Sequence, residues 1–310
     1  MKKLNCLFIF IFCVFAFLGC STHINVRVNR PAEVDLSFVE TIAIIPFAED
    51  PSFWDYVLFG TDEYKISKYF TSRLETKLSN TEYFKVVTTS KEYGTIPPCD
   101  AYISGNIHSL NTNIKQKERI VKDEKTQTEK KIIEFFRVLE FSISYRIIDQ
   151  STGNVLKKFE DSFSLTSEYE SEKSKVPTAC DLAKSELNDV ISDLIRKITP
   201  YTTSKSISLL KDKSKNSQME YADSLVKEGN LVLAYNEFMK VYETTNMFEA
   251  GYNCACILEA QNKYEEAETF LQDLYNKTGN SKALDLLKDV QYEIKQRDKL
   301  IQQNRNRGLN

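Results

Sequence analysis

The feature that most constrains the fold is an internal repeat in the last third of the chain. Small, aromatic and apolar positions recur at an offset of 33 residues: Ala234, Phe238 and Tyr242 match Ala267, Leu271 and Tyr275. Within each set the spacing is four residues, which places the side chains on one face of an α-helix. Repeats of this length are typical of stacked helical hairpins, each burying its apolar face against the next. We therefore predict an all-α module over residues 217–302.

The repeat ends in a segment that closes the module. Gly279-Asn280 ends the second repeat, and residues 281–302 carry apolar side chains at helical spacing before the sequence becomes a polar tail over 303–310. Stacks of this kind usually need about three repeats for independent stability. The module is therefore expected to pack on the first domain or on another chain, unless it is a purely structural appendage.

The N-terminus has the pattern of an export signal. Lys2 and Lys3 precede an apolar run over residues 4–18, which ends at Leu18-Gly19-Cys20. This pattern predicts a signal peptide over residues 1–19. The run is shorter than the roughly 20 apolar residues of a spanning helix, although an uncleaved anchor helix is the alternative. Residues 20–36 are expected to form an extended tether.

Charge and cysteine content exclude several classes of protein. The 310-residue chain has a formal net charge of −3, which gives no electrostatic support for a nucleic-acid partner. It has two histidines and no CxxC motif, so we expect no metal site and no cofactor. Cys99 and Cys180 could pair in an oxidising compartment, a point the sequence leaves open. Cys254 and Cys256 are expected to occupy two packed faces of one helix.

Residues 37–200 predict an α+β domain. Residues 41–47 form a short apolar, β-branched run typical of a buried strand, and residues 62–79 carry a helical stripe. Strands are expected at 84–89 and at 101–110, the latter broken at Gly105. Residues 139–147 alternate strictly, and the turn at 149–154 predicts a hairpin. A final helix stops at Pro200, and Ser- and Lys-rich residues 201–216 are expected to be a linker.

The order of these elements carries a resemblance. A cysteine and short linker precede TIAIIPF (41–47), a helix, YISGNI (102–107) and a turn at DQSTGNV (149–155). Over about residues 20–200 this resembles the curli-secretion (CsgG) and LpoB-type superfamily of bacterial envelope lipoproteins. The resemblance implies an anticodon-binding-like mixed sheet with packed helices and a lipidated Cys20. The module over 217–302, with YEEAE at 264–268, resembles tetratricopeptide (TPR) repeats, which implies a groove for an envelope protein partner.

An aromatic cluster lies between the first strand and the first helix. It includes the single tryptophan, and its candidate partner-binding residues are Phe53, Trp54, Tyr56 and Phe59. Exposed aromatic clusters mark protein interfaces, but these side chains could instead cover the sheet or the junction of the two domains. Docking of the two domains is one way to cover both the cluster and the short helical module.

These observations predict a function without catalysis. The sequence contains no GxSxG, HExxH, GxxxxGK or GxGxxG motif, so we do not expect an enzyme. We expect a lipid-anchored envelope lipoprotein, at the outer membrane facing the periplasm, that acts as a protein-binding scaffold or assembly factor. The alternative is an oligomeric curli-type secretion channel component. The charged stretch Lys115–Lys131 argues against it and is expected to be a solvated hairpin tip. The oligomeric state is left open.

Overall fold

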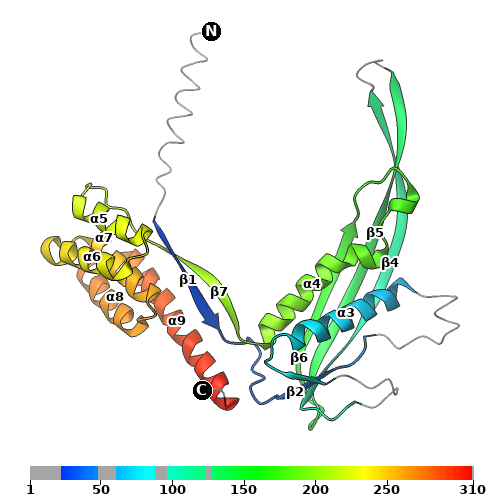
Figure 1. The fold of residues 1–310 in the computed structure, drawn as a ribbon, viewed down its shortest axis with the longest axis horizontal. Helices are drawn as coiled ribbons and strands as arrows, with labels where there is room; N and C mark the ends of the chain where they lie inside the picture. Colours follow the sequence, from blue (N-terminus) through cyan, green and yellow to red (C-terminus); the bar gives the residue numbers. More distant parts are fainter. Residues whose placement is uncertain (1–21, 48–60, 88–95, 123–127, 309–310) are drawn as a thin grey trace. The chain divides into compact units, whose positions relative to one another are not determined.

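The computed structural model describes residues 22–47, 61–87, 96–122 and 128–308. These residues form an α+β structure that divides into two compact units (Figure 1). One unit comprises residues 1–31 and 201–302, and the other comprises residues 32–200 and 303–310. We call them the helical unit and the sheet unit.

The sheet unit is built on a five-stranded mixed sheet of order β3-β2-β4-β5-β6. The strands are β2 (Thr41–Ile44), β3 (Lys85–Val87), β4 (Ala101–Lys122), β5 (Glu129–Asp149) and β6 (Val155–Thr166). The short strand β2 is parallel to both of its neighbours, β3 and β4. The β4–β5 and β5–β6 pairs are antiparallel. The buried run around β2 therefore lies inside the sheet, as its apolar sequence predicts.

Two helices pack on this sheet. Helices α3 (Asp62–Ser79) and α4 (Ala179–Ile198) lie side by side across one face (Figure 1). Thr61 caps the start of α3 and Thr178 caps α4, each by accepting a hydrogen bond from a backbone N–H of the first turn. The predicted apolar stripes of both helices enter a common core with alternate residues of β5. A 3-10 turn (Lys173–Lys175) precedes α4.

The β4–β5 hairpin is longer than the sequence suggested. We expected a strand at residues 101–110, a strand at residues 139–147 and a solvated hairpin tip over Lys115–Lys131, but ladder pairing continues to Lys122 opposite Glu129. The charged side chains of this outer part are mostly exposed, as predicted. The strand also runs through Gly105 without interruption. Backbone hydrogen bonds between strands do not require alternating apolar side chains, so the charged sequence of this outer part gave no indication that it forms paired strands.

The helical unit contains five helices within the described residues. They are α5 (Ser217–Lys227), α6 (Leu231–Thr245), α7 (Phe248–Ala260), α8 (Tyr264–Thr278) and α9 (Ser281–Asn306). Consecutive helices pack against each other from α5 to α8, and the predicted repeat positions Ala234, Phe238, Ala267 and Leu271 are all buried. Cys254 and Cys256 are both buried in α7, as predicted. The helices over 217–302 confirm the helical hairpins.

The predicted tether and linker are instead a paired ribbon. Strand β1 (His23–Arg30) is antiparallel to β7 (Tyr201–Ser208) over all eight residues of each strand. The buried side chains of Ile24, Ile207 and Leu209 join the core of the helical unit. Residues 20–36 and 201–216 therefore differ from the expectation of a tether and a flexible linker, because pairing between them supplies hydrogen bonds that neither segment has alone.

The predicted polar tail also has a structural role, within the sheet unit. Gln303 is almost fully buried; its side chain accepts from the Ala32 N–H (2.9 Å) and donates to the Ala32 carbonyl (3.0 Å). The Arg307 guanidinium lies 3.9 Å from the centre of the Tyr83 ring and donates to the Val39 carbonyl. The segment predicted as a polar tail thus makes specific contacts through Gln303 and Arg307.

Candidate protein-binding surfaces

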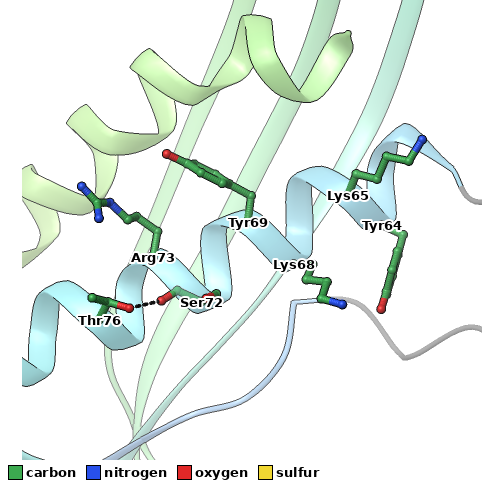
Figure 2. Close-up of a pocket in the computed structure, with 7 residues that line it drawn as sticks. All are labelled: Tyr64, Lys65, Lys68, Tyr69, Ser72, Arg73 and Thr76. Atoms are coloured by element: carbon green, nitrogen blue, oxygen red, sulfur yellow. Dashed lines mark hydrogen bonds between the residues drawn. The ribbon is translucent and has the colours of Figure 1, made fainter.

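The outer face of α3 carries an open depression of about 460 Å³ (Figure 2). The opposite face of the helix is fixed in the core by Ile66, Phe70, Leu74 and Leu78, so the lining residues of the depression lie on its solvent side. The depression is lined by Tyr64, Lys65, Lys68, Tyr69, Ser72, Arg73 and Thr76. Five of these side chains are exposed and the two tyrosines are half-buried. The surface thus combines two tyrosine rings, three cations and the aliphatic hydroxyl groups of Ser72 and Thr76.

Asn188 of α4 orients two of these side chains. Its amide nitrogen donates to the Tyr69 hydroxyl (2.9 Å), and its carbonyl oxygen accepts from Nε of Arg73 (3.1 Å). The ammonium of Lys184, also on α4, lies 5.7 Å from the centre of the Tyr69 ring. The Thr76 hydroxyl turns inward to the Ser72 carbonyl (2.8 Å; Figure 2). Tyr69 and Arg73 are therefore held in place before any ligand arrives.

This arrangement suits acidic protein segments. Arginine and lysine bind carboxylates, and tyrosine supplies rigid contact area with a polar end. The Lys68 ammonium lies 5.7 Å from the centre of the Tyr64 ring, so cation and ring share one patch. These residues lie on a helix rather than on a loop, which favours a preformed docking surface.

The predicted aromatic residues Phe53, Trp54, Tyr56 and Phe59 lie outside the described residues, and so does Cys20. In the sequence this aromatic segment directly precedes α3, since Phe59 comes three residues before Asp62, the first residue of the helix.

In the helical unit, the first helix of each hairpin contacts the β1–β7 ribbon. Asn253 of α7 is buried and holds the backbone just after β7: it accepts from the Leu210 N–H (2.8 Å) and donates to the Leu210 carbonyl (2.9 Å). Thr22, just before β1, donates to Asp223 of α5 (3.2 Å). The face of the module formed by α5, α7 and α9 thus carries a segment of the chain itself.

A charge network links the ribbon to α7 and α9. Lys205 of β7 lies 2.6 Å from the Glu259 carboxylate and 2.7 Å from that of Glu293, and Arg30 of β1 donates to Glu293 (2.8 Å). Both carboxylates are nearly inaccessible to solvent. Burial raises the pKa of Glu259, while for Glu293 the bonds to Arg30 and Lys205 outweigh burial and lower the pKa. Removing Lys205 would leave the buried Glu259 carboxylate without its cation, while Glu293 would keep Arg30.

The cysteines have the properties of structural thiols. Cys99 and Cys180 are free, so the disulfide that the sequence left open is not formed. Burial raises the pKa of Cys254 and of Cys256 far above the ordinary thiol value. A thiol that stays protonated is a poor nucleophile and metal ligand. Within the described residues, no group of three or more candidate side chains could hold a metal ion.

The ribbon contacts were not expected from the sequence, although one of the two strands, β1, has a recognisable strand pattern. Ile24, Val26 and Val28 alternate with polar residues, which is the period of a half-buried strand. The partner strand over 201–208 is rich in Thr and Ser and has little apolar alternation. In the part of the chain that is described, no helix has the length and apolarity to cross a membrane.

Comparisons with known proteins identify no family for this chain. No family model and no curated protein matches it. Solved structures with local similarity include a PelC dodecamer from Paraburkholderia phytofirmans (13% identity, 57% of this chain and 98% of that chain, TM-score 0.29). Another is protein XCC0632 from Xanthomonas campestris, with 12% identity over 53% of this chain and 84% of that chain and a TM-score of 0.29. A third is a minor lipoprotein from Acinetobacter baumannii, with 7% identity over 51% of this chain and 91% of that chain and a TM-score of 0.26. TM-scores this low carry no argument about family or function.

Proposed function

We propose that this protein is a lipid-anchored lipoprotein of the bacterial cell envelope that acts as a non-catalytic, protein-binding scaffold. The anchor is argued from the basic residues, apolar run and Leu18-Gly19-Cys20 at the N-terminus. A diacylglyceryl group plus an N-linked acyl chain on Cys20 would hold the protein firmly, since one chain alone binds only marginally. The finer assignment, the outer membrane facing the periplasm, belongs to the same proposal.

The observation that carries the binding role is the preorganised surface of α3. Tyr69 and Arg73 are fixed by Asn188, and the exposed cations Lys65 and Lys68 lie on the same face. We infer that an acidic segment of an envelope protein docks there. The aromatic residues that precede α3 in the sequence, Phe53, Trp54, Tyr56 and Phe59, are proposed to add apolar contacts to the partner. Aromatic residues and arginine are the side chains that dominate binding energy at protein interfaces.

The helices over 217–302 are best treated as a TPR-like module in this proposal, joined to an anticodon-binding-like domain. The expected role of such a module is to bind a partner in its groove. Here α7 and α9 already bond to Lys205 of the β1–β7 ribbon, and α5 bonds to Thr22 just before β1. This occupation favours the α3 surface as the primary partner site. No observation supports the channel alternative, and the exposed charges of the β4–β5 hairpin oppose it.

Site-specific photocrosslinking in cells tests the binding surface. A photoreactive residue at Tyr64 or Lys68 should capture an envelope protein, and reversing charges with Lys65→Glu and Arg73→Glu should abolish the adduct. The matched control places the same probe at Lys158, an exposed residue of β6. Equal capture at Lys158, or capture that survives the charge reversals, would contradict the assignment.

Mass spectrometry of the mature N-terminus tests the anchor. The expected product begins with an acylated Cys20, and Cys20→Ser should leave the signal uncleaved by the lipoprotein pathway. A mature chain that begins at another residue would remove the anchor from the proposal. The crosslinking result would then still decide whether the α3 surface binds protein.

A further inference from the structure

The outer edge of β5 is open near the end of the β4–β5 hairpin. Strand β6 pairs with β5 only from Val138 onward, and an isolated bridge to Glu170 covers Phe135. Within the described residues, positions 129–134 of β5 have no ladder partner other than β4 (Figure 1). An unpaired edge of this kind is a template for another strand.

The bridge to Glu170 also fixes which backbone groups face outward. The Phe135 N–H and carbonyl both bond to Glu170, so this residue points away from β4. Pairing of β5 with β4 is regular from residue 129 to 140, so outward pointing alternates. The backbone groups of Lys131 and Ile133 therefore face outward, while Lys130, Ile132 and Glu134 bond toward β4.

We propose that this edge pairs antiparallel with the same edge of a second copy of the chain, with the two-fold axis at Ile132. In that register Ile132 lies opposite Ile132 of the second copy, and Lys130 lies opposite Glu134 in both directions. Lys131 and Ile133 then exchange backbone hydrogen bonds with Ile133 and Lys131 of the second copy. The alternation of backbone direction allows this register and excludes those shifted by one residue.

Charge complementarity singles out β5 as the edge that pairs with itself. Opposite charges directly across antiparallel strands stabilise pairing, and like charges oppose it. The proposed register contains two such pairs, Lys130 of each copy opposite Glu134 of the other, on either side of the two Ile132 side chains. Glu134 also lies 3.9 Å from Arg119 of its own chain. At this distance its carboxylate can pair with Arg119 and also with Lys130 of the second copy.

The other edge of the hairpin repels its own copy. In β4 the stretch over residues 115–122 contains four cations, Lys115, Lys117, Arg119 and Lys122, and one acid, Glu118. An antiparallel pair centred on Glu118 would place Lys117 opposite Arg119 and Glu118 opposite itself. One edge of the hairpin thus disfavours self-pairing while the other favours it, which selects a closed dimer over an open array.

A charge-reversal cycle on the full acylated chain in detergent tests the proposal. Lys130→Glu alone and Glu134→Lys alone should each weaken the dimer about ten-fold or more, because each converts two attractive pairs into repulsive ones. The double variant restores both pairs in reversed order and should recover an affinity close to that of the unmodified chain. Sedimentation velocity measures the dissociation constants. Single reversals without effect, or a double variant no better than the singles, would overturn the proposal.

Disulfide trapping checks the register independently of affinity. In a background with Cys99 and Cys180 replaced by Ser, Ile132→Cys should give a covalent dimer, since directly opposed non-hydrogen-bonded residues lie within disulfide distance. Arg119→Cys is the matched control, because Arg119 is the cross-strand partner of Ile132 on the opposite edge of the hairpin. Equal trapping through both positions would show pairing of another kind and refute the Ile132-centred dimer.

Discussion

Gly105 shows how a single residue permits the packing of the sheet unit. A Cβ at this position would lie against the Phe47 ring and the Ser144 carbonyl, and 2.8 Å from Cβ of Tyr145. The glycine therefore lets an aromatic ring lie directly on the backbone of β4. Phe47, Phe70 and Tyr145 form one aromatic cluster at this point, with centroids 4.8–6.4 Å apart.

Gly105→Ala should therefore destabilise the sheet unit by about 2–3 kcal/mol, the usual cost of overpacking a core. Gly153→Ala is the control: Gly153 lies in a turn at φ +70° with open space around it, and should cost about 1 kcal/mol from backbone strain alone. Urea denaturation of the full chain gives both values. Equal losses would mean that close packing at Gly105 adds nothing.

Asp100 provides a pH-dependent contact between β2 and β4. Its carboxylate accepts from the Thr41 N–H (2.7 Å), the Thr41 hydroxyl (2.8 Å) and the Glu40 N–H (2.9 Å). The Thr41 backbone bond is the main reason that the pKa of Asp100 is lowered. A lowered pKa means that the stabilisation is fully present above the unfolded-state value of about 3.9 and is lost as the pH falls through the folded value.

Asp100→Asn should accordingly reduce stability at pH 7, and the difference from the unmodified chain should shrink as the pH falls from about 5 to 2. Thermal denaturation at a series of pH values measures this convergence. Asp149→Asn is not a suitable control, because Asp149 also has a lowered pKa; Asp189→Asn on α4 is preferable. A constant difference across the pH range would contradict the role given to the Asp100 carboxylate.

At the scale of elements, the β1–β7 ribbon completes the helical unit. The two-hairpin module is short, and its core gains the buried side chains of Ile24 in β1, Ile207 in β7 and Leu209 just after β7. Lys205 lies at the centre of this junction because it bonds to carboxylates of both α7 and α9. Burial lowers the pKa of Lys205, but its bonds to Glu259 and Glu293 outweigh burial and raise it.

Lys205→Met should lower the stability of the helical unit by about 3 kcal/mol, because two buried carboxylates lose a shared cation. Adding Glu259→Gln should recover part of the loss, since one of the two buried charges is then removed. Lys213→Ala, an exposed lysine in the same unit, should have no measurable effect. Urea denaturation followed by far-UV circular dichroism tests the series. A double variant less stable than Lys205→Met would contradict the network.

At the scale of the whole molecule, the two segments that flank the sheet unit in sequence meet in the helical unit. β1 ends at Arg30 and β7 begins at Tyr201, and these two residues pair directly. The sheet unit is thus inserted between two strands of the helical unit. The consequence is that the helices depend on a strand about 190 residues before them in the sequence.

A chain that begins at residue 32 should therefore have a less stable helical unit than one that begins at residue 22, although both contain every helix. The loss includes the Arg30–Glu293 bonds and the buried side chain of Ile24. Hydrogen exchange of α7 and α9 measures the effect on this unit alone. Equal protection of these helices in the two chains would show that the ribbon adds no stability.

Local pattern alone predicted the helices of this protein and the class of its fold. The predicted stripe of Ile66, Tyr69, Phe70, Leu74 and Leu78 indicated α3, although Tyr69 is only partly buried, and the stop at Pro200 placed the end of α4 within two residues. The 33-residue repeat indicated the helical hairpins. These features follow from nearest-neighbour chemistry, because helical periodicity and capping depend on residues only a few positions apart.

Tertiary structure alone decided the ribbon, the length of the hairpin and the order on the α3 surface. Pairing of β1 with β7 joins polar segments far apart in sequence, and the charged strands near Lys122 and Glu129 pair through their backbones. Asn188 meets Tyr69 and Arg73 only because α3 and α4 pack side by side. Backbone hydrogen bonds and long-range packing depend on which segments meet in space, and no local sequence pattern specifies that.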